Sequence, residues 1–143
     1  RNVCRDHGTC LIEEFIEGRE FTAGILNGQS LPLIEIRNNR GGFYDFNAKY
    51  IDTDTEFCFD SIKEKPLAGK ITKVAERCFQ VLGCRDFARV DLLMDKHLNI
   101  YPLEVNTIPG FTSHSLLPMA AARAGLSMNE LCSTIIKSAL TRR

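Results

Sequence analysis

The 143-residue sequence has no excess of charge of either sign, because its 18 Lys and Arg residues equal its 18 Asp and Glu residues. Nothing in such a balance attracts a nucleic acid backbone or an anionic membrane as a whole. Any anion that the protein binds must therefore be met by local positive charge. We expect neither a nucleic acid nor a membrane among its partners.

Long apolar runs are also missing, so no stretch reads as a membrane span, and Arg1–Asp6 lacks the apolar core of a signal peptide. There is no initiator methionine, which suggests a piece of a longer protein. The six cysteines form no Cys-x-x-Cys pair, and no His-x-x-x-His accompanies them, which argues against a zinc site. We interpret them as reduced thiols of a cytoplasmic protein.

The first part of the chain is rich in β-prone residues. Cys10–Ile16 and Phe21–Leu26 are apolar runs separated by a short polar turn, which predicts a hairpin. Asn27-Gly28 indicates a tight turn into a third strand, Leu31–Ile36. The stretch of about 38–54 is dominated by Asn, Gly, Asp and aromatic residues, and we expect it to be a mobile functional loop.

Helical spacing returns after Pro66, where one apolar stripe precedes Gly83. The stripe consists of Leu67, Ile71, Val74, Cys78 and Leu82. Strands are predicted at Ala88–Met94 and Ile100–Val105. Because Pro102 cannot donate a ladder hydrogen bond, it requires either an edge position or a site where the N–H would point away from the ladder. Two helices follow, Leu116–Ala124 and one opened by the capping box that begins at Ser127. The pattern predicts one α+β unit over residues 1–143, with a mainly antiparallel sheet.

Polar residues alternate along the last two predicted strands. Side chains two apart in a strand share a face, so Arg89 lies beside Asp91, and Glu104 lies beside Asn106. An antiparallel hairpin would bring both pairs to one face. Carboxylate and carboxamide oxygens suit Mg²⁺, which typically takes one or two carboxylates plus substrate phosphates. An exposed face with a simple Arg–Asp ion pair explains the spacing equally well.

The run from Leu103 to Leu116, LEVNTIPGFTSHSL, closely resembles the signature of the D-alanine–D-alanine ligase family. Agreement in order and spacing extends from about Cys10 to Ala139. The resemblance implies the C-terminal portion of an ATP-grasp fold. It also implies that an N-terminal portion of the same enzyme is missing and that the parent is a homodimer.

Several site residues follow from this resemblance. Those similar to the family's metal ligands, which would hold Mg²⁺ or Mn²⁺ as two ions, are Asp91, Glu104 and Asn106. Those similar to its ATP-binding residues are Glu13, Glu14, Phe15, Ile16, Glu20 and Lys49. Those similar to its catalytic and substrate-binding groups are Arg89, Gly110, Ser115, Leu116 and the loop residue Tyr50. From the residues alone, Lys49 reads as a solvated lysine, Tyr50 as a structural aromatic and Ser115 as an ordinary helix N-cap.

The activity implied by the resemblance is ATP-dependent ligation of two D-alanines to D-alanyl-D-alanine, through an acyl phosphate, for peptidoglycan precursor synthesis. Positioning and electrostatic stabilisation dominate such phosphoryl transfer. The candidate site residues, which are mainly cations and metal ligands, suit this chemistry. A ligase for another pair, such as D-alanine and D-lactate, is one alternative, and a non-catalytic fragment is another. We expect the isolated chain to be inactive.

Overall fold

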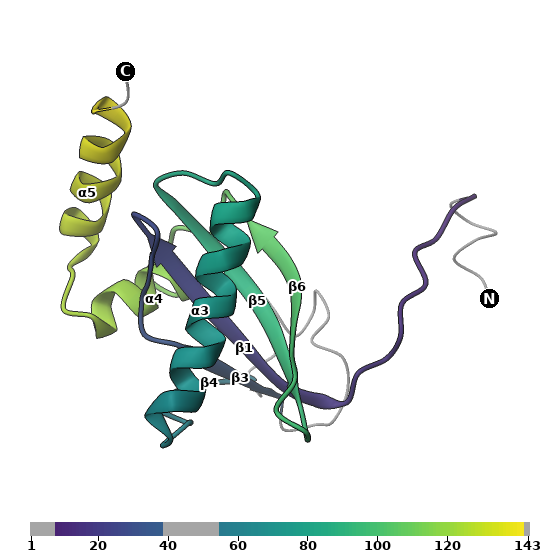
Figure 1. The fold of residues 1–143 in the computed structure, drawn as a ribbon. Coiled ribbons are helices and arrows are strands. Elements are labelled where there is room, and N and C mark those ends of the chain that lie inside the picture. The colour runs from purple at the N-terminus through teal and green to yellow at the C-terminus, as the bar shows by residue number, and fades with distance from the viewer. Residues whose placement is uncertain (1–7, 39–54, 142–143) are drawn as a thin grey trace.

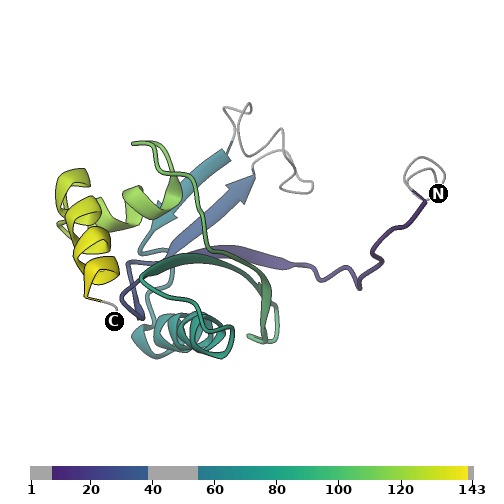
Figure 2. The same ribbon diagram turned by 90° about the horizontal axis from the view of Figure 1, so that it is seen from above.

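The structure is a computed structural model, and it describes residues 8–38 and 55–141. The strands are β1 (Gly18–Leu26), β2 (Gln29–Ser30), β3 (Ile34–Asn38), β4 (Thr55–Phe59), β5 (Phe87–Asp95) and β6 (Ile100–Asn106). The helices are α3 (Lys65–Val81), α4 (Leu116–Arg123) and α5 (Met128–Leu140). The strands form one antiparallel sheet in the order β4-β3-β1-β5-β6, with β2 paired to β1. Helix α3 lies on one face and α4 and α5 on the other, which confirms the α+β prediction (Figures 1 and 2).

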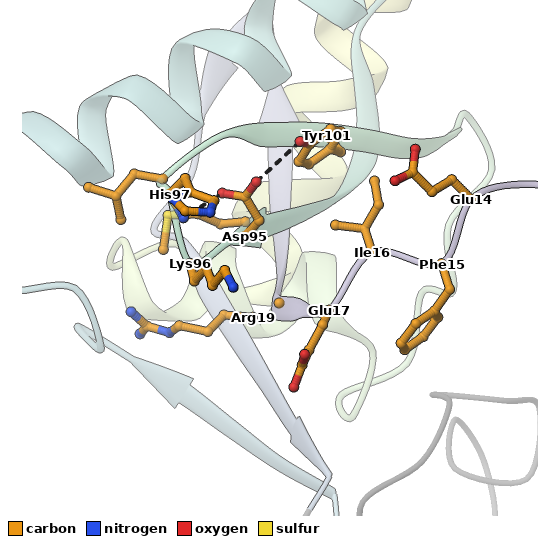
Figure 3. Close-up of a pocket in the computed structure, with 12 residues that line it drawn as sticks. Glu14, Phe15, Ile16, Glu17, Arg19, Asp95, Lys96, His97 and Tyr101 are labelled. Atoms are coloured by element: carbon orange, nitrogen blue, oxygen red, sulfur yellow. Dashed lines mark hydrogen bonds between the residues drawn. The ribbon is translucent and has the colours of Figure 1, made fainter.

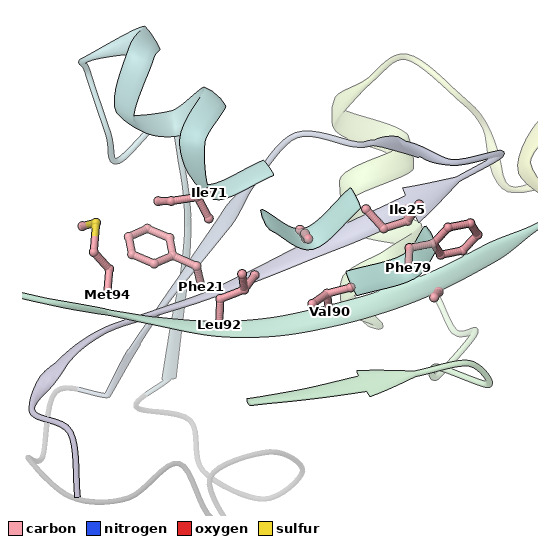
Figure 4. Packing of buried hydrophobic residues seen from close by; sticks show 10 residues of the cluster. Phe21, Ile25, Ile71, Phe79, Val90, Leu92 and Met94 are labelled. Carbon is pink, nitrogen blue, oxygen red and sulfur yellow. The ribbon is translucent and has the colours of Figure 1, made fainter. Parts of the chain in front are cut away.

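The two central strands provide the core beneath α3. Strands β1 and β5 pair along the whole of β1, so the alternate residues of both strands reach the same face together. Phe21 and Ile25 of β1 and Val90 and Leu92 of β5 are completely buried there (Figure 4). Burying each such side chain contributes roughly 1.5–3 kcal/mol. The α3 residues that close this layer are Ile71, Ala75 and Phe79.

The buried face of α3 is rotated from the predicted stripe. Of the predicted residues only Ile71 is fully buried, and Leu82 is 64% exposed because it follows the last helical residue. Ala75 and Phe79 lie four and eight residues after Ile71 and take the central positions instead. The small side chain of Ala75 lets the helix lie close to β1 and β5. A search for large apolar residues at helical spacing does not identify such a position.

Helices α4 and α5 cover only one end of the opposite face. A Cβ at Gly24 of β1 would lie 2.8 Å from Leu117 Cδ1, so glycine permits the close approach of α4. The carboxylate of Asp86 accepts a hydrogen bond from the Ser138 hydroxyl at 2.8 Å, which ties α5 to the start of β5. The Ser127 capping box at the start of α5 is present as predicted. Among residues 8–38 and 55–141, no helix packs on the remainder of this face, along β1, β5 and β6.

The predicted strand Cys10–Ile16 is wrong. These residues form no regular secondary structure, and Leu11 and Ile12 are 82% and 87% exposed. A hairpin onto β1 has no room, because β5 already occupies one side of β1 from Gly18 onward and β3 and β2 occupy the other. Figure 1 shows the segment extending away from the sheet.

The Asn27-Gly28 turn is confirmed, and both residues have the positive φ angles that a tight hairpin turn requires. The following strand begins three residues later than predicted, since Pro32 interrupts the chain between β2 and β3. Strand β4 was not predicted. The expected mobile loop lies almost wholly outside the described residues.

The buried carboxylate of Glu35 links β3 to the start of β1. Both nitrogens of the Arg19 fork donate to Glu35, at 2.8 and 3.0 Å, and Arg37 donates at 2.8 Å. Burial alone would raise the pKa of Glu35, but the hydrogen bonds from Arg19 and Arg37 lower it to about 2. The carboxylate is therefore charged at neutral pH.

We expect Glu35→Gln to lower the free energy of unfolding at pH 7 by about 2 kcal/mol, because charge-assisted hydrogen bonds are lost. A depressed pKa contributes stability above the unfolded-state value and loses it as the pH falls toward the folded-state value. The difference between variant and wild type should therefore be full above about pH 4.5 and shrink toward pH 2. Urea unfolding at pH 7 and pH 3 measures this, with the exposed Glu17→Gln as control. An equal difference at both pH values would contradict the assignment.

Candidate functional site

Strands β5 and β6 bring the four predicted polar residues to one face. Arg89 lies opposite Asn106, and Asp91 lies opposite Glu104, in an antiparallel hairpin. Directly opposed residues in a sheet share a face, whereas Val90 between them faces α3. The predicted hairpin and the shared face are confirmed. The edge position of Pro102 is confirmed too, since β6 ends the sheet and Pro102 lies beside a bulge.

The Arg89 guanidinium lies between the two carboxylates. Its Nε and one terminal nitrogen donate to Asp91 Oδ1 and Oδ2 at 3.0 and 2.8 Å. The same terminal nitrogen lies 3.6 Å from Glu104 Oε1. The Asp91 side chain is 7% exposed and that of Glu104 is 55% exposed. Asp91 is therefore the buried floor of the cluster, and Glu104 is its solvent-facing rim.

Asn106 ends β6 and starts the loop that leads to α4. Its carboxamide oxygen accepts a hydrogen bond from the Ile108 N–H at 3.0 Å. A carboxamide oxygen has two lone pairs, so one remains for another partner. Within residues 8–38 and 55–141, no group of three or more His, Cys, Asp and Glu side chains is placed to hold a metal. Any ion here would instead use the two carboxylates and this amide oxygen.

Ser115 occupies the N-cap position of α4, but its side chain does not cap the helix. Its hydroxyl oxygen instead accepts the Thr112 N–H at 3.0 Å and lies 2.9 Å from the Thr112 hydroxyl. Pro118 at the third helical position has no N–H to offer, which removes one of the usual capping partners. Ser115 is therefore the N-cap residue by position, as expected, but its side chain does not cap the helix. The N–H groups of Leu116 and Leu117 are the donors of this first turn.

Gly110 lies directly against Ser115. A Cβ built on Gly110 would lie 2.8 Å from Ser115 Oγ, closer than ordinary side-chain contacts allow. The site loop thus depends on glycine here for space. The two residues assigned to the second substrate are in contact, and Leu116 follows at the helix start.

The described residues assigned to the nucleotide lie in two places. Glu14, Phe15 and Ile16 line a pocket of about 810 Å³ at the turn between β5 and β6, and Glu13 lies just before it. Figure 3 shows the Ile16 side chain directed toward Tyr101 of β6. Glu20 is half-buried on β1, opposite Leu93 of β5. Lys49 and Tyr50 lie outside the described residues.

Asp95 organises the turn beside this pocket. Its carboxylate accepts hydrogen bonds from the N–H groups of His97 and Asn99 at 2.8 and 2.9 Å, and from the Tyr101 hydroxyl at 3.2 Å. The Asn99 side chain donates as well, and together these donors lower the pKa of Asp95 to about 2. The pocket therefore has a rigid, negatively charged end.

Sequence reasoning missed two residues of the site, Thr22 and Thr112. Thr22 Oγ1 donates to Asp91 Oδ1 at 2.6 Å, and Thr112 holds the Ser115 hydroxyl. A threonine at the centre of a buried, mostly apolar strand was the available signal for Thr22. Nothing in the sequence identified Thr112, because its contact depends on the shape of the loop.

Two further observations concern the helices and the cysteines. No helix in the parts that the structure describes is both long and apolar enough to cross a bilayer. Cys58, Cys78, Cys84 and Cys132 are half-buried thiols that form no disulfide. Burial raises the pKa of the Cys78 thiol, which makes it less reactive.

Comparison with solved structures finds the same fold in D-alanine–D-alanine ligases. The ligase of Bacillus anthracis superposes with a TM-score of 0.76 at 38% identity, covering 90% of this chain and 41% of that chain. A second structure of that enzyme, complexed with ATP, gives a TM-score of 0.75 at 33% identity. The D-alanine–D-alanine ligase of Coxiella burnetii gives a TM-score of 0.70 at 25% identity.

Comparison of sequences agrees. The chain is 44% identical over 135 residues to the D-alanine–D-alanine ligase of Nitrosospira multiformis and 40% identical over 130 residues to that of Saccharophagus degradans. The two alignments cover 94% and 91% of this chain but only 44% and 41% of the relatives. The chain therefore spans about two fifths of the length of these relatives. The family model described as D-ala D-ala ligase C-terminus matches residues 1–137. The chain belongs to the C-terminal family of D-alanine–D-alanine ligases.

Proposed function

We propose that this chain supplies the metal- and nucleotide-binding part of an enzyme that joins two D-alanines into D-alanyl-D-alanine at the expense of ATP. The product would serve peptidoglycan precursor synthesis. The observation that carries the proposal is the cluster of Arg89, Asp91, Glu104 and Asn106 on one face of β5 and β6. The names of the family and of its relatives support D-alanine over D-lactate as the second substrate.

The cluster suits Mg²⁺ or Mn²⁺, as one ion or two, in the chemistry of its donors. Asp91, Glu104 and Asn106 would hold the metal through hard oxygen atoms, which both ions prefer. When bound, the metal supplies positive charge beside the phosphate oxygens of ATP. Glu104 is the accessible ligand because its side chain is 55% exposed. The buried ligand, Asp91, is held in place by hydrogen bonds from two other residues.

ATP would lie across the open face between the pocket and the cluster. Glu14, Phe15 and Ile16 would meet the base, and Glu20 would meet the ribose from the neighbouring strand. The pocket volume of about 810 Å³ lies within the range usual for ligand sites. A relative has been solved with ATP. Lys49 and Tyr50 stay predictions, as a phosphate contact and a residue that helps close the site.

The remaining groups would stabilise charge that develops on the substrates. Arg89 and the Gly110 N–H would face the oxyanion of the tetrahedral intermediate, a role that fixed donors perform well. Ser115 and the Leu116 N–H would bind the carboxylate of the second D-alanine, since a helix N-terminus favours an anion. The contact between Gly110 and Ser115 places these two functions side by side.

The other partner would be the part of the ligase that the relatives have and this chain does not, here called the N-terminal part. The exposed segment with Leu11, Ile12 and Phe15 is a suitable surface for it, because large exposed apolar side chains indicate an interface. The complete ligase, meaning this chain joined to the N-terminal part, would be a cytoplasmic homodimer. The half-buried thiols of Cys58, Cys78, Cys84 and Cys132, which form no disulfide, fit a reducing compartment.

An ADP-release assay with ATP, Mg²⁺ and D-alanine tests the proposal. We expect turnover by the complete ligase and none by this chain alone, since the site is built from both parts. Turnover by the chain alone would contradict the incomplete site. Turnover by the complete ligase only when D-lactate is present would reassign the second substrate. Absence of turnover in both would support a non-catalytic role.

A further inference from the structure

Thr22 is a buried residue that contacts the proposed metal ligand Asp91 without being a ligand itself. It lies on β1 opposite Asp91, and the two residues are 1% and 5% exposed. Its hydroxyl donates to Asp91 Oδ1 at 2.6 Å. On its other side, Thr22 lies opposite the buried Ile34 of β3, which offers no polar side-chain atom. The hydroxyl therefore depends on Asp91 as its acceptor.

The hydrogen bonds to Asp91 are unequal between its two oxygens. Oδ1 accepts two of them, from Thr22 and from Arg89 Nε. Oδ2 accepts one, from a terminal nitrogen of Arg89. A carboxylate oxygen offers about two lone-pair sites, so Oδ1 is filled and Oδ2 keeps one free. Oδ2 is also the oxygen bonded to the nitrogen that lies near Glu104.

We propose that Thr22 is a positioning residue of the metal site: it holds Asp91 Oδ1 against β1, so that Oδ2 is the oxygen presented with Glu104 to the metal. This inference rests on the proposed function and adds to it a residue that would not touch the ion. A neutral donor suits the role because it fixes the carboxylate without cancelling its charge. Arg89 alone could not do this, since it bonds to both oxygens.

A merely structural role for Thr22 predicts a different outcome. In that case its hydroxyl only satisfies a buried group, and its loss would lower stability but leave metal affinity unchanged. Partners of metal ligands typically contribute about 10- to 100-fold to metal affinity when they orient the ligand. Metal binding therefore separates the two roles, whereas stability does not.

The test compares Thr22→Val and Thr22→Ser in the complete ligase. Valine keeps the shape and removes the donor, and serine keeps the donor. Mn²⁺ binding is followed by the electron paramagnetic resonance signal of the free ion, in the presence of a non-hydrolysable ATP analogue. We expect about a 10-fold weaker Mn²⁺ affinity for Thr22→Val and an affinity near wild type for Thr22→Ser. Thr72→Val, in α3 on the opposite face, is the matched control and should bind as wild type does.

Two failures are distinguishable. Equal Mn²⁺ affinity of wild type and a folded Thr22→Val overturns this inference and leaves the proposed function standing. A wild-type ligase that binds no Mn²⁺ overturns the metal site and, with it, the inference. If Thr22→Val does not fold, the Thr22→Ala and Thr22→Ser pair makes the same comparison with smaller side chains, and equal affinity of that pair overturns the proposal. A parallel rise in the KM for Mg²⁺ with kcat retained at saturating Mg²⁺ would support it.

Discussion

Glu104→Gln in the complete ligase should reduce ATP-dependent ADP release by at least about 100-fold, because a ligand contributes no less than the residues that orient it. The substitution preserves shape and removes the charge that a divalent cation needs. The side chain is 55% exposed, so the fold should be nearly unaffected. Steady-state ADP release and thermal unfolding, measured together, separate loss of chemistry from loss of fold.

The matched control is Glu64→Gln. Glu64 is exposed and precedes α3 on the opposite face of the sheet, where it makes no side-chain cap. Its substitution should leave turnover unchanged. If Glu104→Gln retained the turnover of wild type, the assignment of Glu104 as a metal ligand would be wrong. If the unfolding midpoint of Glu104→Gln fell sharply together with its turnover, the loss of turnover would reflect loss of the fold.

The site could be predicted wherever its geometry follows from strand periodicity. Alternation along β5 and β6, with the Asp95–Asn99 turn between them, fixes Arg89, Asp91, Glu104 and Asn106 to one face. Register in a hairpin is set by its turn and its apolar face, both of which are visible in the sequence. The bulge beside Pro102 shifts the pairing by one residue without changing the face of Glu104.

Other features could not be predicted because they depend on contacts distant in the sequence. Cys10–Ile16 has the composition of a strand, but pairing requires an unoccupied neighbour, and both sides of β1 are taken. The hydrogen bond between Thr22 and Asp91 joins residues 69 positions apart. The buried face of α3 was displaced because packing against two strands favoured Ala75 over bulkier neighbours.

The polar cluster on β5 and β6 holds charges where burial makes them costly. Arg89 and Asp91 are largely buried, and an ion pair in such a place contributes little to stability unless its geometry is good. Here the guanidinium makes two hydrogen bonds to one carboxylate and lies near a second. A hydrophobic pair could fill the same space, so stability alone does not require these charges, which supports the proposed role of the cluster in binding.

Gly110→Ala in the complete ligase should lower kcat/KM for D-alanine by about 100-fold, since a displacement near 1 Å at a reacting site can have an effect of this size. The added Cβ would lie 2.8 Å from Ser115 Oγ, so the loop or the serine must move. Either movement disturbs the hydroxyl that Thr112 holds. Gly69→Ala is the control, because a Cβ there meets nothing within 4 Å and alanine favours its helix.

The mechanism of the Gly110 effect is tested by a double substitution. If the damage arises from the clash with Ser115 Oγ, Ser115→Ala and Gly110→Ala/Ser115→Ala should have similar kcat/KM values for D-alanine, because the atom that clashes is already gone. Residues in contact are expected to be non-additive in this way. Additive losses would instead mean that Gly110 is required for the approach of its backbone N–H to the substrate, independently of Ser115.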